Sequence, residues 1–132
     1  MIAAVYKGIG CMTVEDVPTP AIQDGDLLVK VKACAICGGD LRTFHHGHAA
    51  IKPPIILGHE FAGEIVAAGI GCGHCSYCLS GNQHLCYHRL TLGHQYHGGF
   101  AEFVRIPAIA VQAGNVNLIP ASVDYLSATL AE

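Results

Sequence analysis

The clearest pattern in the sequence is the alternation of apolar and polar residues over positions 27–36. Every second residue from Leu27 to Ala33 is apolar, and Lys30 and Lys32 stand between them. Successive side chains of a strand point to opposite faces, so this alternation predicts a half-buried β-strand. Shorter apolar runs bounded by glycine and proline predict further strands over 2–6, 12–17, 61–68, 100–106, 108–112 and 116–119.

Two short helices are predicted among these strands. Asp40 follows two glycines and is the predicted N-cap of a helix over 41–46, which Gly47 ends. Ser122 is the predicted N-cap of a helix over 123–131, so residues 122–132 form the start of a truncated helix. No repeat or linker divides the chain. The sequence therefore predicts one mainly β, barrel-like domain over residues 1–132, with a loop rich in glycine and cysteine over 69–86.

Composition narrows the partners and the compartment. Apolar residues make up 52 % of the chain and charged residues 13 %, which argues against a disordered chain. The net charge of −3, without any cluster of lysine and arginine, argues against nucleic acid as a partner. No apolar run is long enough for a membrane span, and the N-terminus lacks the apolar stretch of a signal peptide. We therefore expect a cytoplasmic protein.

Four of the seven cysteines fall within fifteen residues, in the spacing Cys72-x2-Cys75-x2-Cys78-x7-Cys86. In a cytoplasmic chain such clustering favours metal ligation over disulfides. The two-residue gaps let a tight turn place successive sulfurs around one ion, and four thiolates form the closed tetrahedral site of a structural zinc. An iron–sulfur cluster stays open as an alternative, because its fourth ligand can be remote, although the ferredoxin spacing C-x2-C-x2-C-x3-C-P differs in its last gap.

A second group of metal-binding residue types is spread along the chain. Cys37 follows the predicted strand and precedes two glycines, and His59 and Glu60 follow Gly58. One thiolate, one imidazole and one carboxylate can bind zinc and leave a coordination position open, which is the arrangement of a catalytic site. From the spacing alone the more usual interpretation is a small core cysteine and a histidine whose hydrogen bonds are satisfied in the core or at the surface.

Four motifs, read together and in order, carry a family resemblance. They are Ala35-Ile36-Cys37-Gly38-Gly39-Asp40, Leu57-Gly58-His59-Glu60-Phe61-Ala62-Gly63, Cys72-Gly73-x-Cys75-x-x-Cys78, and Gly98-Gly99-Phe100-Ala101-Glu102-Phe103-Val104. In these motifs the chain resembles the GroES-like catalytic domain of zinc-dependent medium-chain alcohol and polyol dehydrogenases, above all the sorbitol and threonine dehydrogenases. The resemblance implies a mainly β, GroES-like, partly open barrel with short helices and a zinc-binding loop.

The same resemblance implies two zinc ions per chain. Cys37 and His59 match catalytic-zinc ligands, Glu60 matches a residue that joins the coordination shell or supports it, and Asp40 matches a residue that hydrogen-bonds near His59. Glu132 matches a glutamate near that zinc. The structural-zinc ligands would be Cys72, Cys75, Cys78 and Cys86. The intact enzyme would oxidise a secondary alcohol or polyol with NAD(P) as hydride acceptor.

The chain departs from this family in three respects. Gly39 stands where the family has a threonine or serine that starts a proton relay, and Arg42 stands where many relatives have a relay histidine. The segment 68–72 is shorter than in the family. No G-x-G-x-x-G motif follows a strand, so we expect the Rossmann nucleotide-binding domain to be absent from this chain and the chain alone to be inactive.

Two other interpretations stay open at this stage. The chain can be a structural, zinc-stapled domain or a designed truncation without catalysis, or an iron–sulfur electron carrier. For the dehydrogenase the expected partner is a small alcohol or polyol, with neither nucleic acid nor membrane involved. Family members pair mainly through the nucleotide-binding domain, so the isolated domain can be monomeric.

Overall fold

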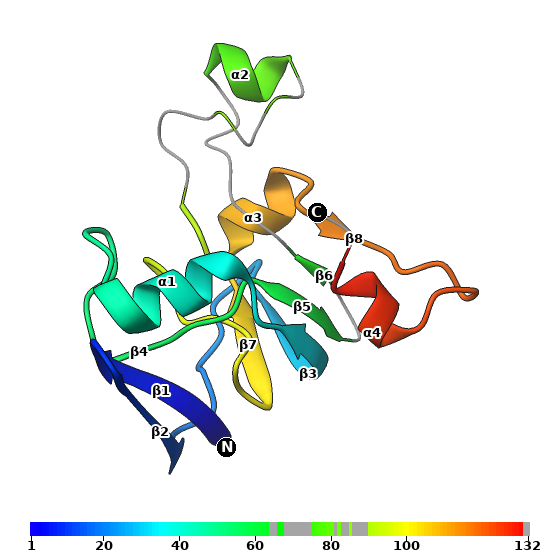
Figure 1. Cartoon of the computed structure of the whole chain (residues 1–132). Coiled ribbons are helices and arrows are strands. Elements are labelled where there is room, and N and C mark those ends of the chain that lie inside the picture. The colour runs from blue at the N-terminus through cyan, green and yellow to red at the C-terminus, as the bar shows by residue number, and fades with distance from the viewer. Residues whose placement is uncertain (64–65, 68–74, 81, 83–84, 86–89, 131–132) are drawn as a thin grey trace.

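The computed structural model describes residues 1–63, 66–67, 75–80, 82, 85 and 90–130. Its strands are β1 (Ile2–Gly8), β2 (Cys11–Asp16), β3 (Leu27–Ala35), β4 (Ile55–Ile56), β5 (Glu60–Gly63), β6 (Val66–Ala67), β7 (Phe103–Ile106) and β8 (Val116–Asn117). Its helices are α1 (Gly38–His46), α2 (Ser76–Leu79), α3 (Ala108–Gln112) and α4 (Tyr125–Ala128). The predicted mainly β class with short helices is confirmed (Figure 1). None of these helices has the length and apolar character needed to cross a membrane.

The strands form two three-stranded sheets and a two-stranded ribbon, in the orders β2-β1-β4, β5-β3-β7 and β6-β8. All strand pairings in the described part of the chain are antiparallel, whereas a Rossmann domain is built on a parallel sheet. The segment before β7 joins the two larger sheets. Ala4 N–H donates to the carbonyl of Phe100 on one side, and Val31 N–H donates to the carbonyl of Glu102 on the other, at 2.8 and 2.9 Å.

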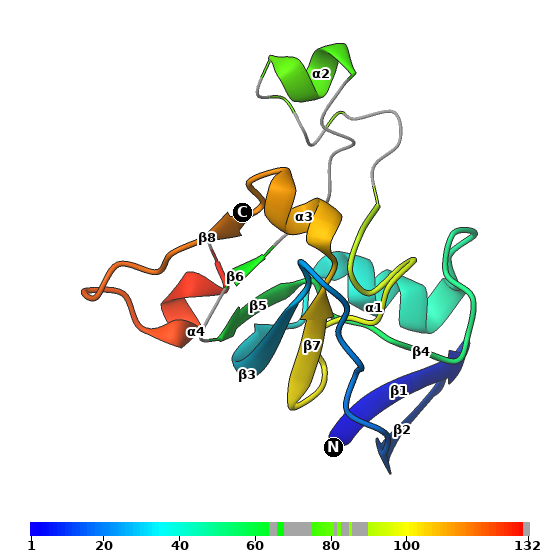
Figure 2. The ribbon, with the colours of Figure 1, turned by 180° about the vertical axis from the view of Figure 1, so that it is seen from behind.

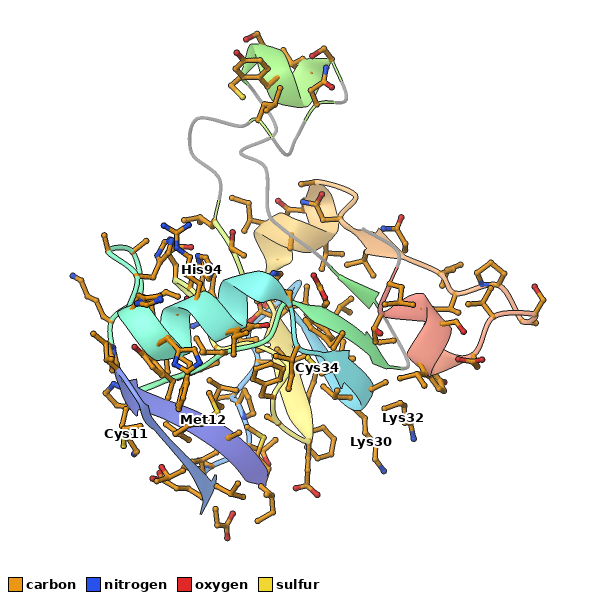
Figure 3. The ribbon with its side chains drawn as sticks, in the orientation of Figure 1. Cys11, Met12, Lys30, Lys32, Cys34 and His94 are labelled. Carbon is orange, nitrogen blue, oxygen red and sulfur yellow. The ribbon has the colours of Figure 1, made fainter. Side chains whose placement is uncertain are left out.

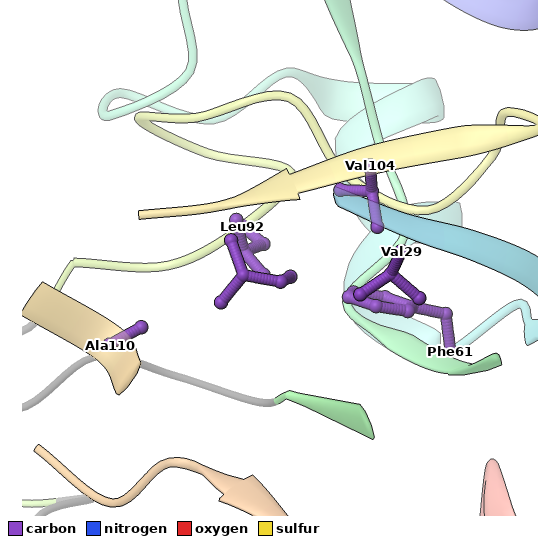
Figure 4. Close-up of a cluster of buried hydrophobic side chains, with 6 residues drawn as sticks. Val29, Phe61, Leu92, Val104 and Ala110 are labelled. Carbon is purple, nitrogen blue, oxygen red and sulfur yellow. The ribbon is translucent and has the colours of Figure 1, made fainter. Parts of the chain in front are cut away.

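The alternation that predicted β3 matches its burial. Val29 is 1 % exposed, whereas Lys30 and Lys32 are exposed and project outward from the strand (Figure 3). Val29 belongs to the main core cluster, in which it packs with side chains from β5, β7, α3 and the segment before β7 (Figure 4). The other buried members of that cluster are Phe61, Leu92, Val104, Ile106 and Ala110.

A second core cluster lies between β1, β4 and α1. Tyr6, Ile51, Ile55 and Leu57 are its buried members. The Tyr6 hydroxyl donates to the Thr43 carbonyl at 3.1 Å, so the aromatic ring fills the core while its polar end ties β1 to α1. Helix α1 consequently lies against one side of the strands, in front of them in Figure 1 and behind them in Figure 2.

The start of α1 differs from the prediction. The helix begins at Gly38, and its N-cap is Cys37, not Asp40. Asp40 is the third helical residue, and its carboxylate accepts from the Cys37 N–H to complete a capping box. Gly47 ends the helix with φ of 75°, as the sequence predicted.

Several other predicted boundaries were wrong. Residues 108–112 form helix α3 and no strand, because Pro107 sets the extended N-cap and Gly114 follows with φ of 71°. Helix α4 covers only Tyr125–Ala128, and its N-cap is Asp124, whose carboxylate accepts from Ser127 N–H, not Ser122. The predicted strand 100–106 is regular only over β7. The predicted strand 61–68 is described as β5 and β6, with 64, 65 and 68 outside the described residues.

Two glycines allow the chain before β5 to lie against the segment before β7. Gly98 N–H donates to the Ile56 carbonyl and Gly99 N–H to the Gly58 carbonyl, both at 2.8 Å. A Cβ atom at position 98 would overlap the carbonyl groups of Leu57 and Gly58, and backbone cannot move aside as a flexible side chain can. Glycine at 98 is therefore a packing requirement.

Replacing Gly98 by alanine should destabilise the domain by about 1–3 kcal/mol or more, because the added methyl group meets fixed backbone. Gly38→Ala is the matched control. A Cβ at Gly38 has open space and the residue is exposed, so the change should stay within about 0.5 kcal/mol. Urea unfolding of both variants measures the difference, and equal stabilities would contradict the packing described here.

Candidate metal centre

The antiparallel register of β3 and β5 brings two distant motifs together. Ala35 at the end of β3 pairs with Glu60 at the start of β5. Cys37 lies two residues beyond that pair along one strand direction, and His59 lies one residue before it on the other. In an antiparallel pair the end of one strand faces the start of the next, so these side chains share one edge of the sheet.

The structure groups three side chains that could hold a metal ion: Cys37, Asp40 and His59, whose ligand atoms all lie within 4.8 Å of one another. The Cys37 Sγ to His59 Nε2 distance is 3.3 Å. Two ligands of a tetrahedral zinc, with bonds of about 2.3 Å to sulfur and about 2.0–2.1 Å to nitrogen, lie about 3.5 Å apart. The sulfur and nitrogen atoms therefore already stand close to the separation that a shared zinc ion requires.

The Asp40 carboxylate links the two segments that carry Cys37 and His59. The carboxylate is 7 % exposed and accepts hydrogen bonds from the backbone N–H of Cys37 at 3.1 Å and of Gly58 at 3.3 Å. Its Oδ1 atom lies 3.8 Å from His59 Nδ1, which is beyond hydrogen-bond range. His59 Nδ1 is buried and has no hydrogen-bond partner among the described residues. Histidines that bind metals through one ring nitrogen usually donate the other N–H to a carboxylate, and Asp40 lies on that side of His59 without accepting this hydrogen bond in the structure.

The Cys37 thiol is held at the start of α1. Its sulfur accepts from Gly39 N–H at 3.2 Å and from Asp40 N–H at 3.4 Å. Burial is the largest influence on the pKa of Cys37 and raises it, while the backbone N–H of Asp40 opposes that rise. Without a metal the group is therefore a thiol at neutral pH, and a bound cation has to displace its proton.

Cys34 lies close to this centre but has a different role. Burial raises the pKa of Cys34 to about 12, and the nearby carboxylates of Asp40 and Glu60 add to the rise. A thiol with that pKa does not ionise near neutral pH, so it behaves as a small apolar residue under Gly58, with which it is in close contact. Cys37 thus belongs to the candidate metal-binding group, whereas Cys34 lies outside it.

Two histidines that the sequence did not place lie beside the centre. The His94 ring meets the His59 ring edge-on with centroids 6.0 Å apart, and the His48 ring lies 4.8 Å from that of His94. His94 comes from the turn before the Gly98 segment, which packs on Gly58. His59 and His94 are 35 residues apart in the sequence, so no local pattern indicates that they meet. The contact follows only from the packing of the Gly98 segment on Gly58.

The structure shows less about the other residues that the sequence predicted for the two metal sites. Glu60 starts β5 beside the centre but is outside the group whose ligand atoms lie within 4.8 Å of one another. Arg42 is exposed on α1. Cys75 is half-buried and directly precedes α2, and Cys78 is described only as a residue of that helix. Cys72, Cys86 and Glu132 lie outside the described residues.

Gly39 lies close to the sulfur of Cys37. A Cβ atom at this position would lie 3.2 Å from Cys37 Sγ and 3.9 Å from His59 Cε1. A side chain at position 39 would therefore face Cys37 Sγ and the His59 ring, and the close contact with the sulfur would require a small shift of that neighbour.

Comparisons with known proteins bear on this geometry. The model of the alcohol dehydrogenase GroES-like domain matches residues 23–115. A sorbitol dehydrogenase of Halalkalibacterium halodurans is 38 % identical over 99 % of this chain and 42 % of its own length. An L-threonine 3-dehydrogenase of Francisella philomiragia is 36 % identical over 93 % of this chain and 39 % of its own length. The chain thus spans about two-fifths of the curated relatives it matches.

Solved structures agree in fold over almost the whole chain. A protein of Sinorhizobium meliloti 1021, described as a zinc-binding dehydrogenase and solved with NADP, is 32 % identical with a TM-score of 0.82, covering 99 % of this chain and 42 % of its own. The alcohol dehydrogenase of Thermus sp. ATN1 is 28 % identical with a TM-score of 0.80, covering 95 % and 42 %.

The alignment with the sorbitol dehydrogenase runs over 149 positions against 132 residues here, so at least 17 positions lack a residue in this chain. This agrees with the expected shortening, although its predicted place, 68–72, lies outside the described residues. The family match covers more than half of the chain and includes both motifs of the metal centre. The chain therefore belongs to the family defined by the alcohol dehydrogenase GroES-like domain.

Proposed function

We propose that Cys37 and His59, supported by Asp40, hold the catalytic zinc of an NAD(P)-dependent alcohol or polyol dehydrogenase that oxidises a secondary alcohol. The observation that carries the proposal is the 3.3 Å pairing of Cys37 Sγ with His59 Nε2 in front of the buried Asp40 carboxylate. A zinc ion bound by one thiolate and one imidazole keeps room for further ligands, as catalytic sites require.

Zinc in this place would act as a Lewis acid that lowers the pKa of a bound alcohol. The chain's own residues have other tasks. Cys37 and His59 supply the ligand atoms, and Asp40 keeps both in position through the backbone N–H groups of Cys37 and Gly58. Glu60 stays a proposed ligand or supporting residue at the start of β5, and Glu132 stays a proposed neighbour of the zinc.

Residue 39 has no side chain that could accept the proton released by the substrate alcohol. Gly39 offers no hydroxyl, and Arg42 is exposed on α1. Water reaching the open side of Cys37 and His59 is the simplest substitute, since His59 retains 18 % exposure. The centre is therefore expected to bind metal and alcohol more readily than it turns substrate over.

The second proposed zinc is structural and is held by Cys72, Cys75, Cys78 and Cys86. The proposal rests on the spacing and on the family, because only Cys75 has a described side chain among the four. Its expected contribution is folding free energy, since the ligands need the ion to fold into one lobe.

The wider activity would need more than these residues. We propose that NAD(P) and the small alcohol meet this centre in a protein of the relatives' length, through a nucleotide-binding domain that also forms the oligomer. The cytoplasm is the proposed compartment. By itself the 132-residue chain is expected to show no turnover.

A zinc-stapled structural domain without catalysis is the second candidate, and the missing hydroxyl at Gly39 favours it. Both candidates predict bound zinc. They differ in whether the centre can turn over an alcohol when a nucleotide-binding domain is supplied.

The metal content of purified chains tests the two zinc sites. The unaltered chain should carry about two zinc ions by native mass spectrometry. His59→Ala should remove about one, and Cys75→Ser should remove the other and lower the Tm, because structural zinc supplies folding free energy. Cys11→Ser, at an exposed cysteine on β2, should change neither. If His59→Ala keeps the full metal content, the proposed catalytic site is empty or elsewhere.

Thiol alkylation of the metal-free chain tests the protonation of the centre. The pKa values of Cys37 and Cys34 are raised, so their thiolate fractions are small at neutral pH and grow only as pH rises. At pH 8 iodoacetamide should modify the exposed Cys11 first, Cys37 more slowly and Cys34 hardly at all, as peptide mass spectrometry would show. Zinc should then protect Cys37. Equal rates at Cys37 and Cys11, or no protection by zinc, would contradict the account.

Complementation distinguishes the two candidates. The chain is mixed with the nucleotide-binding half of the Halalkalibacterium halodurans relative, and reduction of NAD is followed with sorbitol. We expect weak turnover that rises at least tenfold in Gly39→Ser, since a positioned proton-transfer group contributes about 10²–10⁴-fold. Gly38→Ser, at the neighbouring exposed position, should give no rise. Absence of turnover in both Gly39→Ser and the unaltered chain, with zinc bound, would favour the structural candidate.

A further inference from the structure

A cavity of about 650 Å³ lies beside the metal centre and is not used by the proposed reaction. It is bounded by the segment after β2, the segment before β4, the turn that carries His94, and β7. Its volume falls within the range of about 300–1,000 Å³ that is typical of small-molecule sites. His94 lines the cavity, and its ring centroid lies 6.0 Å from that of His59, so the cavity is close to the metal centre.

The charged side chains of the cavity are all cationic. Lys52 and Arg105 line it, and no aspartate or glutamate does. The Arg105 Nε atom donates to the Asp26 carboxylate at 2.6 Å, which fixes the guanidinium group in place. Asp26 also accepts from the backbone N–H of Ala108 at 2.8 Å, and its carboxylate balances the charge of Arg105. Lys52 has no ion-pair partner in the part of the chain that the structure describes, and its charge is uncompensated.

The neutral polar groups of the cavity also present donors. Gln95 Oε1 accepts from Thr91 N–H at 2.9 Å, so the side-chain NH₂ of Gln95 remains as a donor. His97 Nδ1 accepts from Ile56 N–H at 3.2 Å, which places the ring hydrogen of the neutral imidazole on Nε2. In both side chains the acceptor atom is occupied by a backbone N–H group. The donor group of each side chain is therefore available to a ligand. Apolar residues such as Pro20 and Ile55 complete the wall.

We propose that this cavity binds the anionic group, a carboxylate or a phosphate, of a small organic molecule. The exposed Lys52, which has no ion-pair partner among the described residues, and two neutral donors favour an anion over a metal ion or an amine, while the Arg105 guanidinium is already paired with Asp26. The apolar wall suits a short carbon skeleton. This inference does not rest on the proposed dehydrogenase activity, because neither Cys37 nor His59 lines the cavity.

Titration of the ¹⁵N-labelled chain with inorganic phosphate at constant ionic strength tests the proposal. Saturable shifts are expected for the backbone amides of Lys52, Gln95 and His97. Lys52→Gln should weaken the Kd about tenfold or more, the effect of losing one charge-assisted hydrogen bond. Lys30→Gln is the matched control, since Lys30 is exposed on β3 on a different part of the surface (Figure 3). Shifts that do not saturate, or an equal loss in Lys30→Gln, would overturn the proposal.

The source of the anionic group is decided by a second titration of the zinc-loaded chain. Glycerol phosphate is compared with inorganic phosphate, both at saturation. Added shifts at Cys37 and His59 with glycerol phosphate alone would mean that the anion belongs to an alcohol that reaches the metal centre. Shifts confined to the cavity would mean a separate ligand. If zinc does not bind but phosphate does, the proposed function fails while the anion site stands.

Discussion

The candidate centre depends on one buried carboxylate. Asp40 accepts from the backbone N–H of Cys37, three residues before it, and from that of Gly58, 18 residues after it in another motif. A buried carboxylate is stable only when such hydrogen bonds replace its hydration, so the two motifs and the side chain stabilise one another. The N-terminus of α1 adds favourable electrostatics for a negative charge at its third residue. Replacing this group would loosen both ligand-bearing segments at once.

The rest of the fold places the backbone N–H groups of Cys37 and Gly58 within hydrogen-bond distance of that carboxylate. The β3–β5 register aligns residues 37 and 59, and the glycines at 98 and 99 let a third segment lie on the Gly58 backbone. The turn before that third segment contains His94, and β7 follows the segment. The same few backbone contacts therefore place the candidate metal ligands, the neighbouring His94 ring and one wall of the cavity proposed to bind an anion.

Much of this arrangement could be predicted from the sequence. The strand over Leu27–Ala35 followed from alternation, the end of α1 from Gly47, and the fold from four ordered motifs. The capping role of Cys37 could not be predicted, because a thiol is an unusual N-cap and Asp40 is a common one. The helix over 108–112 was missed because a short apolar run fits either structure, and only Pro107 before it and Gly114 after it favoured a helix. The contacts of His94 and the donors around Lys52 arise from tertiary packing, which leaves no local pattern.

The central claim is that Cys37 and His59 bind one metal ion in front of Asp40. Cadmium-113 substitution with ¹H–¹¹³Cd correlation spectroscopy tests it directly, because scalar couplings exist only through metal–ligand bonds. The account predicts one cadmium resonance coupled to the Cys37 Hβ protons and to a ring proton of His59, separate from a second resonance coupled to cysteines of the lobe alone. A spectrum in which every cadmium resonance couples only to lobe cysteines would contradict it.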